Sequence, residues 1–407
     1  MRCGLLGRKL GHSYSPQIHA MLGSYDYQLF EKELEDLESF LKHGNFDGLN
    51  VTIPYKKAVI PYCSILSPTA QKLGAVNTIV RREDGTLIGH NTDYFGFQSM
   101  LKESKLSVAG KKALVLGSGG ASGTAVAVLK EAGATVIVIS RNGENNYQNL
   151  HQHQDAAVIV NATPVGMYPN CHETPLKLSG FPMLEGVLDL IYNPARTELL
   201  LEAEEHGLIA VNGLWMLVAQ AKESSEWFTG TTLDDAKISL VYQSLRQQME
   251  NIILIGMPGC GKSTVGLRIA QQTGRKFVDS DEEIEALAQK TIPRIFAEDG
   301  EAVFRALENN VLTRLGKESA LVIATGGGCV TKQENYRALH RNGSLIWLQR
   351  PVSDLATEGR PLSAAGKLEE MYRIRKPLYE GFSDYTVVNR SPQQAAAEIL
   401  SILGATL

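Results

Sequence analysis

The chain has 407 residues, more than one typical hydrophobic core accommodates, which predicts two or three domains. Hydrophobic residues make up 43% and charged residues 21%, both ordinary for a globular protein. The net charge of −4 argues against a general nucleic-acid or membrane surface. Five scattered cysteines without C-x-x-C favour reduced thiols. With no signal peptide and no apolar run of about 18 residues, we expect a cytoplasmic protein.

Strand-like and helix-like patterns alternate along the chain, which predicts the α/β class. The join at residues 243–250 holds no Gly-, Pro- or Ser-rich linker, so we expect a short, stiff connection to the strand after it. The expected elements are, in order, a first unit at 1–90, a strand at 112–116, a helix at 124–133, strands at 135–139, 157–160 and 186–190, helices over 214–248, a strand at 251–255, a helix from 265, and strands at 277–281 and 321–324.

Two serines, Ser13 and Ser15, precede a helix whose first turn suits Pro16. They are two residues apart, so their hydroxyls share one side of an extended chain. Beside the positive end of a helix they would suit a carboxylate, whereas a simple N-cap is the alternative that this fragment alone favours.

A short apolar strand ends in N-V-T-I-P-Y-K (50–56). If a helix starts at Pro54, Thr52 and Lys56 face the same cleft. Lys56 is suited to proton transfer there if a carboxylate faces it, and Asp93 is the candidate. The alternative is a surface lysine and an N-capping aspartate.

A glycine-rich loop, G-S-G-G-A-S-G (117–123), follows the strand at 112–116. Glycines at such a turn let a dinucleotide pyrophosphate approach a helix N-terminus. The G-x-G-x-x-G pattern is imperfect because Ser122 takes its sixth position, so an ordinary strand–helix turn stays open. After the next strand, Arg141 suits the 2′-phosphate of NADP, and a solvated arginine is the alternative.

The first half of the chain resembles shikimate dehydrogenase in a series of motifs that runs in order over residues 1–245. The motifs are H-S-Y-S-P (12–16), N-V-T-I-P-Y-K (50–56), G-A-V-N-T (74–78), G-H-N-T-D (89–93), G-S-G-G-A-S-G (117–123), N-A-T-P-V-G-M (161–167), D-L-I-Y-N-P (189–194) and N-G-L-W-M-L-V-A-Q (212–220). The resemblance implies NADPH-dependent reduction of 3-dehydroshikimate to shikimate.

The resemblance also assigns residues to roles. It implies Lys56 and Asp93 as the catalytic pair. The implied substrate ligands are Ser13, Ser15, Thr52, Lys56, Asn77, Asp93, Tyr192 and Gln220. The implied NADP ligands are Gly117, Gly119, Gly120, Ala121, Ser140, Arg141, Asn161, Thr163 and Gly213. The usual N-R-T of the family reads Ser140-Arg141-Asn142 here, and the helix expected before the strand at 157–160 is short or irregular.

The second half opens on G-M-P-G-C-G-K-S-T (256–264), which fits the P-loop pattern between a buried strand and a helix. Its backbone is expected to cradle the phosphates of ATP, with Lys262 on the β- and γ-phosphates and Ser263 on Mg²⁺. A strand then ends in Asp279-Ser280-Asp281, where one carboxylate can serve Mg²⁺ and the other a hydroxyl nucleophile. A plain helix start is the alternative at D-S-D.

Together with F-R-A-L-E (304–308), G-G-G (326–328), G-R-P-L (359–362) and R-K-P-L-Y (375–379), these motifs resemble shikimate kinase over residues 251–407. On spacing alone, Arg305 and Glu308 make a surface ion pair as the alternative. The resemblance implies ATP ligands at Gly259, Cys260, Gly261, Lys262, Ser263, Thr264 and Arg360. It implies shikimate ligands at Asp281, Arg305, Gly326, Gly327, Gly328 and Arg375. It implies Lys262, Asp281 and Arg360 as catalytic and Ser263 and Asp279 as metal ligands.

The sequence therefore predicts a bifunctional enzyme with NADP(H), ATP and Mg²⁺ as cofactors and small molecules, not nucleic acids or membranes, as partners. The expected domains are a substrate-binding domain at 1–100, a Rossmann-like NADP domain at 101–212, returning helices at 213–248 and a P-loop kinase domain at 249–407, with a parallel sheet between helices. A kinase for another small metabolite, or a noncatalytic nucleotide-binding module, remains the alternative for the second half. The oligomeric state is not indicated.

Overall fold

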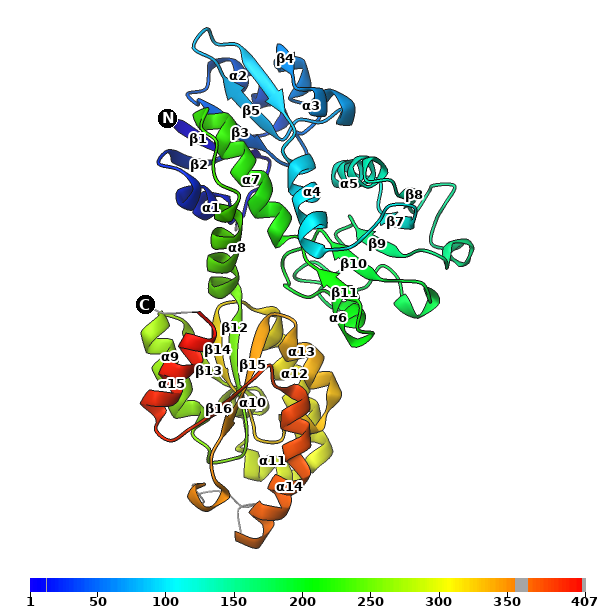
Figure 1. Cartoon of the computed structure of the whole chain (residues 1–407). Helices are drawn as coiled ribbons and strands as arrows, with labels where there is room; N and C mark the ends of the chain where they lie inside the picture. Colours follow the sequence, from blue (N-terminus) through cyan, green and yellow to red (C-terminus); the bar gives the residue numbers. More distant parts are fainter. Residues whose placement is uncertain (12, 356–364, 405–407) are drawn as a thin grey trace. The chain divides into compact units, whose positions relative to one another are not determined.

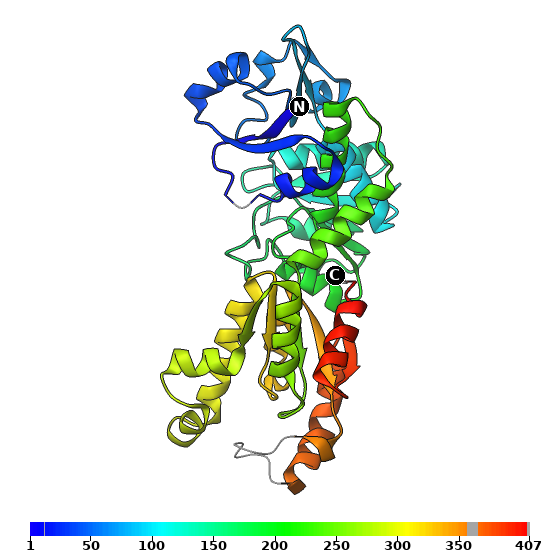
Figure 2. The ribbon, with the colours of Figure 1, turned by 90° about the vertical axis from the view of Figure 1, so that its left-hand side faces the viewer.

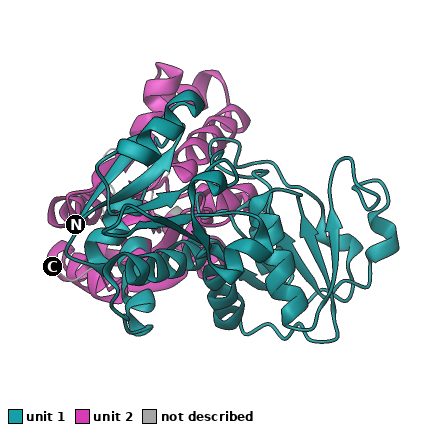
Figure 3. Cartoon of the chain, turned by 90° about the horizontal axis from the view of Figure 1, so that it is seen from above, with its two compact units in different colours: residues 1–193, 197–245 teal, residues 194–196, 246–407 magenta. Residues whose placement is uncertain are grey.

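The structure is a computed structural model that describes residues 1–11, 13–355 and 365–404 (Figure 1). The chain divides into two compact units (Figure 3). Unit 1 consists of Met1–Asn193 and Thr197–Leu245, and unit 2 of Pro194–Arg196 and Arg246–Leu407. Both units alternate strands and helices, so the predicted α/β class is confirmed.

The first sheet of unit 1 is mixed, because its strands pair both parallel and antiparallel. Its order is β2 (Asp26–Glu31), β1 (Arg2–Gly7), β3 (Gly48–Val51), β5 (Thr78–Arg81), β6 (Leu87–His90) and β4 (Ile65–Leu66). Its helices are α1 (Ser15–Leu22), α2 (Leu37–His43), α3 (Pro68–Leu73) and α4 (Asp93–Ser104), with short 3₁₀ turns at Leu34–Asp36 and Ile60–Tyr62.

The second sheet of unit 1 is parallel throughout. Its order is β11 (Ile209–Val211), β10 (Gly186–Asp189), β9 (Val158–Asn161), β7 (Lys112–Leu116) and β8 (Thr135–Ile139). Its helices are α5 (Gly120–Glu131) and α6 (Glu198–Glu205), with 3₁₀ turns at Leu150–His153 and Leu178–Gly180. The turn at Leu150–His153 stands where a short or irregular helix was expected between β8 and β9.

Two helices follow the second sheet, α7 (Leu214–Thr229) and α8 (Ala236–Met249), where helical structure was expected over 214–248. Helix α7 packs along α4 and also contacts α1, so it returns to the first sheet of unit 1 (Figure 1). The boundary between the units falls inside α8, and only Glu250 separates α8 from the next strand. The prediction that the connection at 243–250 is short is thus confirmed.

Unit 2 is built on one parallel sheet, with helices on both faces (Figures 1 and 2). Its central strand, β12, is fully buried, as the apolar run at residues 252–255 after Asn251 indicates for a strand inside a parallel sheet. The strand order is β13 (Lys276–Asp279), β14 (Leu321–Ala324), β12 (Asn251–Ile255), β15 (Gly343–Gln349) and β16 (Tyr385–Val388). The helices are α9 (Lys262–Thr273), α10 (Ser280–Ala288), α11 (Ile292–Glu298), α12 (Glu301–Lys317), α13 (Gln333–His340), α14 (Ala365–Phe382) and α15 (Pro392–Ile402), with 3₁₀ turns at Cys329–Thr331 and Val352–Asp354.

One local expectation was wrong: no helix starts at Pro54. Residues 53–59 form hydrogen-bonded turns, in which the N–H of Tyr55 donates to the carbonyl of Thr52 at 2.9 Å. A helix would give the carbonyl of Lys56 to residue 60, but that carbonyl accepts from the N–H of Val76 at 2.8 Å. A bond to the neighbouring chain segment thus replaces the helical one.

Among the described residues, no helix combines the length and the apolar character that crossing a membrane requires. The five cysteines, all within the described residues, are free thiols.

Candidate active sites

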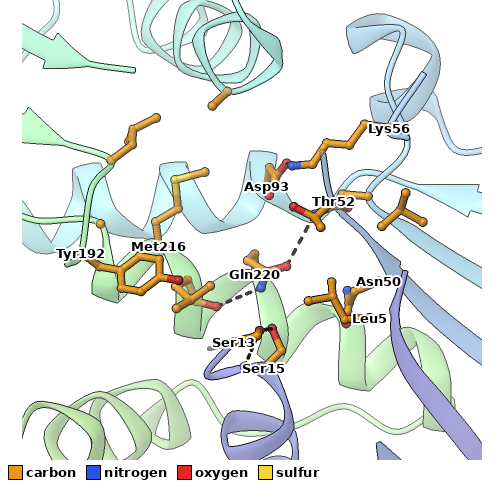
Figure 4. A pocket seen from close by; sticks show the side chains of 16 residues that line it. Leu5, Ser13, Ser15, Asn50, Thr52, Lys56, Asp93, Tyr192, Met216 and Gln220 are labelled. Carbon is orange, nitrogen blue, oxygen red and sulfur yellow. Dashed lines mark hydrogen bonds and ion pairs between the residues drawn. The ribbon is translucent and has the colours of Figure 1, made fainter. Parts of the chain in front are cut away.

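A pocket of about 260 Å³ in unit 1 collects the eight side chains predicted to bind the dehydrogenase substrate (Figure 4). They come from segments spread over residues 13–220. Ala121 and Gly213, predicted for the cofactor, line the same pocket. Neighbours that the prediction left out complete the wall: Leu5, Asn50, Val51, Leu190, Met216 and Leu217.

Lys56 and Asp93 point toward each other in this pocket (Figure 4). Lys56 Nζ donates to Asp93 Oδ2 at 2.5 Å, and the two side chains are 23% and 13% exposed. Asp93 is the first residue of α4, where the partial positive charge of the helix N-terminus favours a carboxylate. Lys56 is therefore held at the pocket wall by its contact with Asp93, and the surface-lysine alternative is excluded by its position.

The two serines lie side by side at the start of α1. Ser13 Oγ donates to Ser15 Oγ at 3.2 Å and accepts from the backbone N–H of Ser15. Tyr14 is the N-cap residue, and no side-chain hydrogen bond caps α1 within the described chain. The serine N-cap alternative is thus wrong, and both hydroxyls face the pocket.

Another part of the pocket wall carries the amide groups of two side chains. Asn77 precedes β5, Gln220 lies on α7, and Asn77 Nδ2 is 3.5 Å from Gln220 Oε1. Asn77 Oδ1 accepts from the backbone N–H of Thr92 at 2.7 Å, which fixes the orientation of its amide. Tyr192 closes another side, with its ring edge-to-face against Tyr14 at 6.2 Å. Hydroxyl and amide groups and the Lys56–Asp93 pair thus line part of the cavity, and apolar side chains line the rest.

The residues predicted for NADP lie where three parallel strands end. Gly117, Gly119, Gly120 and Ala121 follow β7 and begin α5, Ser140 and Arg141 follow β8, and Asn161 and Thr163 lie at the end of β9. Carboxyl ends of parallel strands meet at one edge of a sheet, where open α/β sheets bind nucleotides. A Cβ atom built on Gly119 or Gly120 meets nothing within 4 Å, so room for a pyrophosphate exists beside the N-terminus of α5. The residues fit the cofactor.

Asp189, at the end of β10, is a buried carboxylate that links the end of β9 to the segment after β10 by hydrogen bonds. It accepts from Thr197 Oγ1 at 2.6 Å and from Asn161 Nδ2 and the N–H of Ile191, both at 3.0 Å. Asn161 in turn accepts from the N–H and the hydroxyl of Thr163. Burial of the Asp189 carboxyl raises its pKa from 3.8 to about 6, although these donors oppose the rise.

The P-loop of unit 2 joins β12 to α9, as the motif predicts. Lys262 is buried, and its Nζ donates to the carbonyls of Gly256 at 2.9 Å and Met257 at 3.0 Å. Gly261 has a φ of 96°, and a Cβ atom there would lie 2.5 Å from Asn389 Nδ2. Glycine is therefore required at this turn. The loop sits at the N-terminus of α9, which suits phosphate groups.

Ser263 and Asp279, predicted as metal ligands, are in contact: Ser263 Oγ donates to Asp279 Oδ2 at 2.7 Å. Asp279 Oδ1 accepts from the backbone N–H of Asp281 and caps α10. The helix-start alternative for D-S-D is thus also realised. A hydroxyl and a carboxylate oxygen are the hard ligands that Mg²⁺ takes alongside phosphate oxygens and water, so the pair fits that ion.

Arg305 and Glu308 form a buried pair on α12, not the surface ion pair of the alternative. Arg305 NH1 donates to Glu308 Oε2 at 2.8 Å, and their side chains are 13% and 0% exposed. Burial raises the pKa of Glu308, and the nearby Asp281 carboxylate raises it further, against the charge of Arg305. A Cβ atom on Gly328 would lie 2.6 Å from the Arg305 guanidinium, so the glycine run brings backbone against this arginine.

Arg375, on α14, reaches the same glycines, since its NH1 donates to the carbonyl of Gly327 at 3.1 Å. Tyr379, one turn later and fully buried, donates to that carbonyl at 2.5 Å. Two arginines from different helices thus converge on one loop, beside Asp281, whose Oδ1 would be 2.7 Å from a Cβ atom on Gly326. Such a pair suits a carboxylate.

One predicted site residue, Arg360, lies outside the described residues, with the motif G-R-P-L (359–362) that contains it. His12 of the first motif also lies outside. The prediction left out Asn50, which lines the dehydrogenase pocket, and Tyr379, which donates to the carbonyl of Gly327. Asn50 was within a quoted motif, and its place at the end of a buried strand was a usable signal. Tyr379, within R-K-P-L-Y, gave no signal separate from ordinary core packing.

Comparisons with known proteins agree with both halves. A family model described as shikimate dehydrogenase substrate binding domain matches residues 5–79, and one described as shikimate kinase matches residues 258–404. Shikimate dehydrogenase (NADP(+)) of Clostridium perfringens is 35% identical over 265 residues, which cover 60% of this chain and 97% of that protein.

Solved structures place the fold of unit 1 in the same family. Shikimate dehydrogenase 1 of Peptoclostridium difficile is 39% identical with a TM-score of 0.56, covering 60% of this chain and 97% of that one. The Thermus thermophilus enzyme in complex with NADP(H) and shikimate is 33% identical with a TM-score of 0.55, covering 60% and 99%. The match to the kinase model favours shikimate as the acceptor over the alternatives for the second half. The chain therefore belongs to the shikimate dehydrogenase family and carries a shikimate kinase domain behind its dehydrogenase.

Proposed function

We propose that the pocket around Lys56 and Asp93 is where unit 1 reduces 3-dehydroshikimate, and that the P-loop region of unit 2 phosphorylates the shikimate so formed. The observation that supports this most is the pocket itself. Eight side chains, chosen from separate sequence motifs, line one cavity of about 260 Å³. The product of the first reaction is the acceptor of the second, so the two proposed activities are consecutive steps, and each supports the assignment of the other.

In the reductase, NADPH supplies the hydride when bound at the ends of β7, β8 and β9. Lys56 lies beside the substrate and donates a proton to the carbonyl oxygen as that oxygen gains negative charge. Asp93 holds the ammonium group in place across their 2.5 Å contact. The hydroxyls of Ser13, Ser15 and Thr52 and the amides of Asn77 and Gln220 bind the carboxylate and ring hydroxyls of the substrate.

In the kinase, ATP supplies the phosphoryl group when bound at the P-loop. Lys262 exchanges its carbonyl partners for phosphate oxygens, and backbone N–H groups at the start of α9 hold the remaining charge. Asp281 accepts a hydrogen bond from the attacking hydroxyl of shikimate. Arg305 and Arg375 bind the shikimate carboxylate as charge-assisted pairs. Arg360 would stabilise charge on the transferred group.

We further propose Mg²⁺ as the metal of the kinase, held by Ser263 and Asp279, which neutralises phosphate charge when bound. Contact between these two oxygen ligands at 2.7 Å supports the assignment. We also propose a substrate-binding domain at 1–100, an NADP domain at 101–212, returning helices at 213–248 and a P-loop kinase domain at 249–407, supported by the three separate sheets. A cytoplasmic location is proposed from the five free thiols.

Two assays on the purified chain test the proposal. NADPH oxidation is followed with 3-dehydroshikimate, and ADP formation with shikimate and Mg-ATP. We expect both activities, with Lys262→Ala abolishing only the second. Absence of turnover in either assay would remove the corresponding function. Loss of both activities in a folded Lys262→Ala protein would contradict two independent sites.

A further inference from the structure

Ser224 lies at the centre of a buried cluster of hydroxyl and amide groups behind the dehydrogenase pocket, and the mechanism above gives it no role. It is on α7, one turn after Gln220, and its side chain is fully buried. Its Oγ is 2.7 Å from Asn50 Nδ2, 2.9 Å from the hydroxyl oxygens of Thr78 and Thr92, and 2.9 Å from the carbonyl oxygen of Gln220. Four chain segments therefore meet at one hydroxyl.

Backbone partners fix which way the two pocket amides face. The N–H of Thr92 can only donate, so Asn77 presents Oδ1 to it at 2.7 Å and its nitrogen lies 3.0 Å from the Thr92 hydroxyl. The carbonyl of Leu217 can only accept, so Gln220 presents Nε2 to it at 3.0 Å. Gln220 Oε1 then lies 3.3 Å from the same Thr92 hydroxyl. That hydroxyl thus contacts both amides.

The hydrogen-bonding capacity of Ser224 is fully used. A serine hydroxyl donates one hydrogen and accepts through two lone pairs. The hydrogen goes to the carbonyl of Gln220, which can only accept, and one lone pair takes the N–H of Asn50. The second lone pair is left for the hydroxyl of Thr78 or Thr92. Ser224 consequently limits which way the Thr92 hydroxyl points, and with it the partners left to Asn77 and Gln220.

We propose that Ser224 is a positioning residue for substrate binding by the dehydrogenase. Its hydroxyl holds the amide of Asn50 directly and, through the hydroxyl of Thr92, supports the Asn77 and Gln220 amides in the places from which they receive the ring hydroxyls of the substrate. The inference rests on the proposed assignment of Asn77 and Gln220 to the substrate. The Lys56–Asp93 pair makes its own contact outside this cluster, so loss of the Ser224 hydroxyl weakens binding and leaves proton transfer intact.

Ser224→Ala in the full chain tests this. We expect the KM for 3-dehydroshikimate to rise about tenfold, with kcat within about twofold of the unaltered protein, as for a lost binding interaction. The pH profile of kcat should not move. Ser225→Ala is the matched control, because Ser225 is the next residue of α7, is about equally buried, and its hydroxyl makes none of the hydrogen bonds of this cluster.

Ser224→Thr is the rescue variant, since threonine keeps a hydroxyl that bonds the carbonyl four residues earlier in a helix. Its KM should stay within about threefold of the unaltered protein even if it unfolds at a lower temperature. If Ser224→Ala does not fold, Ser224→Cys takes its place, because a thiol keeps the volume and is a weak hydrogen-bond partner. The KM should again rise.

An unchanged KM in Ser224→Ala overturns the proposal. So does an equal rise in Ser225→Ala, which would indicate a general loosening of α7. A shifted pH profile also overturns it, because Ser224 would then act on proton transfer. An unaltered protein that fails to reduce 3-dehydroshikimate would count against the proposed function itself.

Discussion

Replacing Lys56 and Asp93 separately tests the acid–base pair, because one change removes the proton donor and the other removes only the charge of its hydrogen-bond partner. Lys56→Ala removes the proton donor. A positioned acid typically contributes about 10²–10⁴ in rate, so kcat should fall about 1,000-fold, or about 4 kcal/mol of transition-state stabilisation. Asp93→Asn leaves Lys56 in place with a neutral acceptor.

The structure limits the second effect. The Lys56 and Asp93 side chains are 23% and 13% exposed, so solvent reduces the value of their charge pairing below that of a fully buried pair. A charged hydrogen bond contributes about 1.5–3 kcal/mol at most, which corresponds to a fall of about 10- to 100-fold in kcat. We therefore expect Lys56→Ala to lose more activity than Asp93→Asn.

The assay is NADPH oxidation with 3-dehydroshikimate, with three checks on the same samples. Lys57→Ala, at the exposed neighbouring residue, should remain near the unaltered rate. ADP formation with shikimate should be unchanged in every variant. NADPH binding, followed by its fluorescence, checks that unit 1 is folded. A larger loss in Asp93→Asn than in Lys56→Ala would refute the assigned roles, because the carboxylate would then carry the proton itself.

Three further predictions concern other buried or charged groups. Glu308→Gln should raise the kinase KM for shikimate about tenfold, because Arg305 loses a fully buried partner, whereas Glu301→Gln, 67% exposed on the same arginine, should change it less than about twofold. Arg141→Ala should raise the KM for NADPH about tenfold and leave that for NADH unchanged, whereas Lys130→Ala, at an exposed residue of α5, should leave both KM values unchanged. The raised pKa of Asp189 means that the folded state holds its proton more tightly, so the contribution of Asp189 to stability is fully present below about pH 4 and falls by about 3 kcal/mol as pH rises through about 6. Asp189→Asn should flatten that fall in calorimetric unfolding of unit 1 between pH 4.5 and 7, and an unchanged slope would contradict the assignment.

Much of the site could be predicted because chemistry-bearing residues follow strands. Arg141 and Asp279 were found at the ends of apolar runs, and Asn161 was found from the motif that carries the resemblance. Parallel strands bring their carboxyl ends to one edge whatever the loops do. Burial was harder. The spacing of Arg305 and Glu308 places them on one face of a helix, but only contacts with other elements decide whether that face is covered.

The cluster around Ser224 was beyond sequence reasoning for a related reason. A serine inside a helix is unremarkable in composition, and its partners are up to 174 residues away along the chain. The helix expected at Pro54 failed similarly, since the carbonyl of Lys56 is taken by Val76, a residue that local pattern does not connect to it. Long-range hydrogen bonds leave no periodic signal.

The junction between α8 and β12 bears on where the two enzymes can be cut apart. Arg275, half-buried in unit 2, donates to the carbonyl of Glu250 at 2.5 Å and to that of Gln247, the last turn of α8. Burial lowers the pKa of this guanidinium, so losing either acceptor is costly. A kinase fragment that began at the first residue of β12 would expose that arginine and remove both acceptors. The structural border of the kinase unit therefore precedes its first strand, so a kinase fragment should keep the last turn of α8.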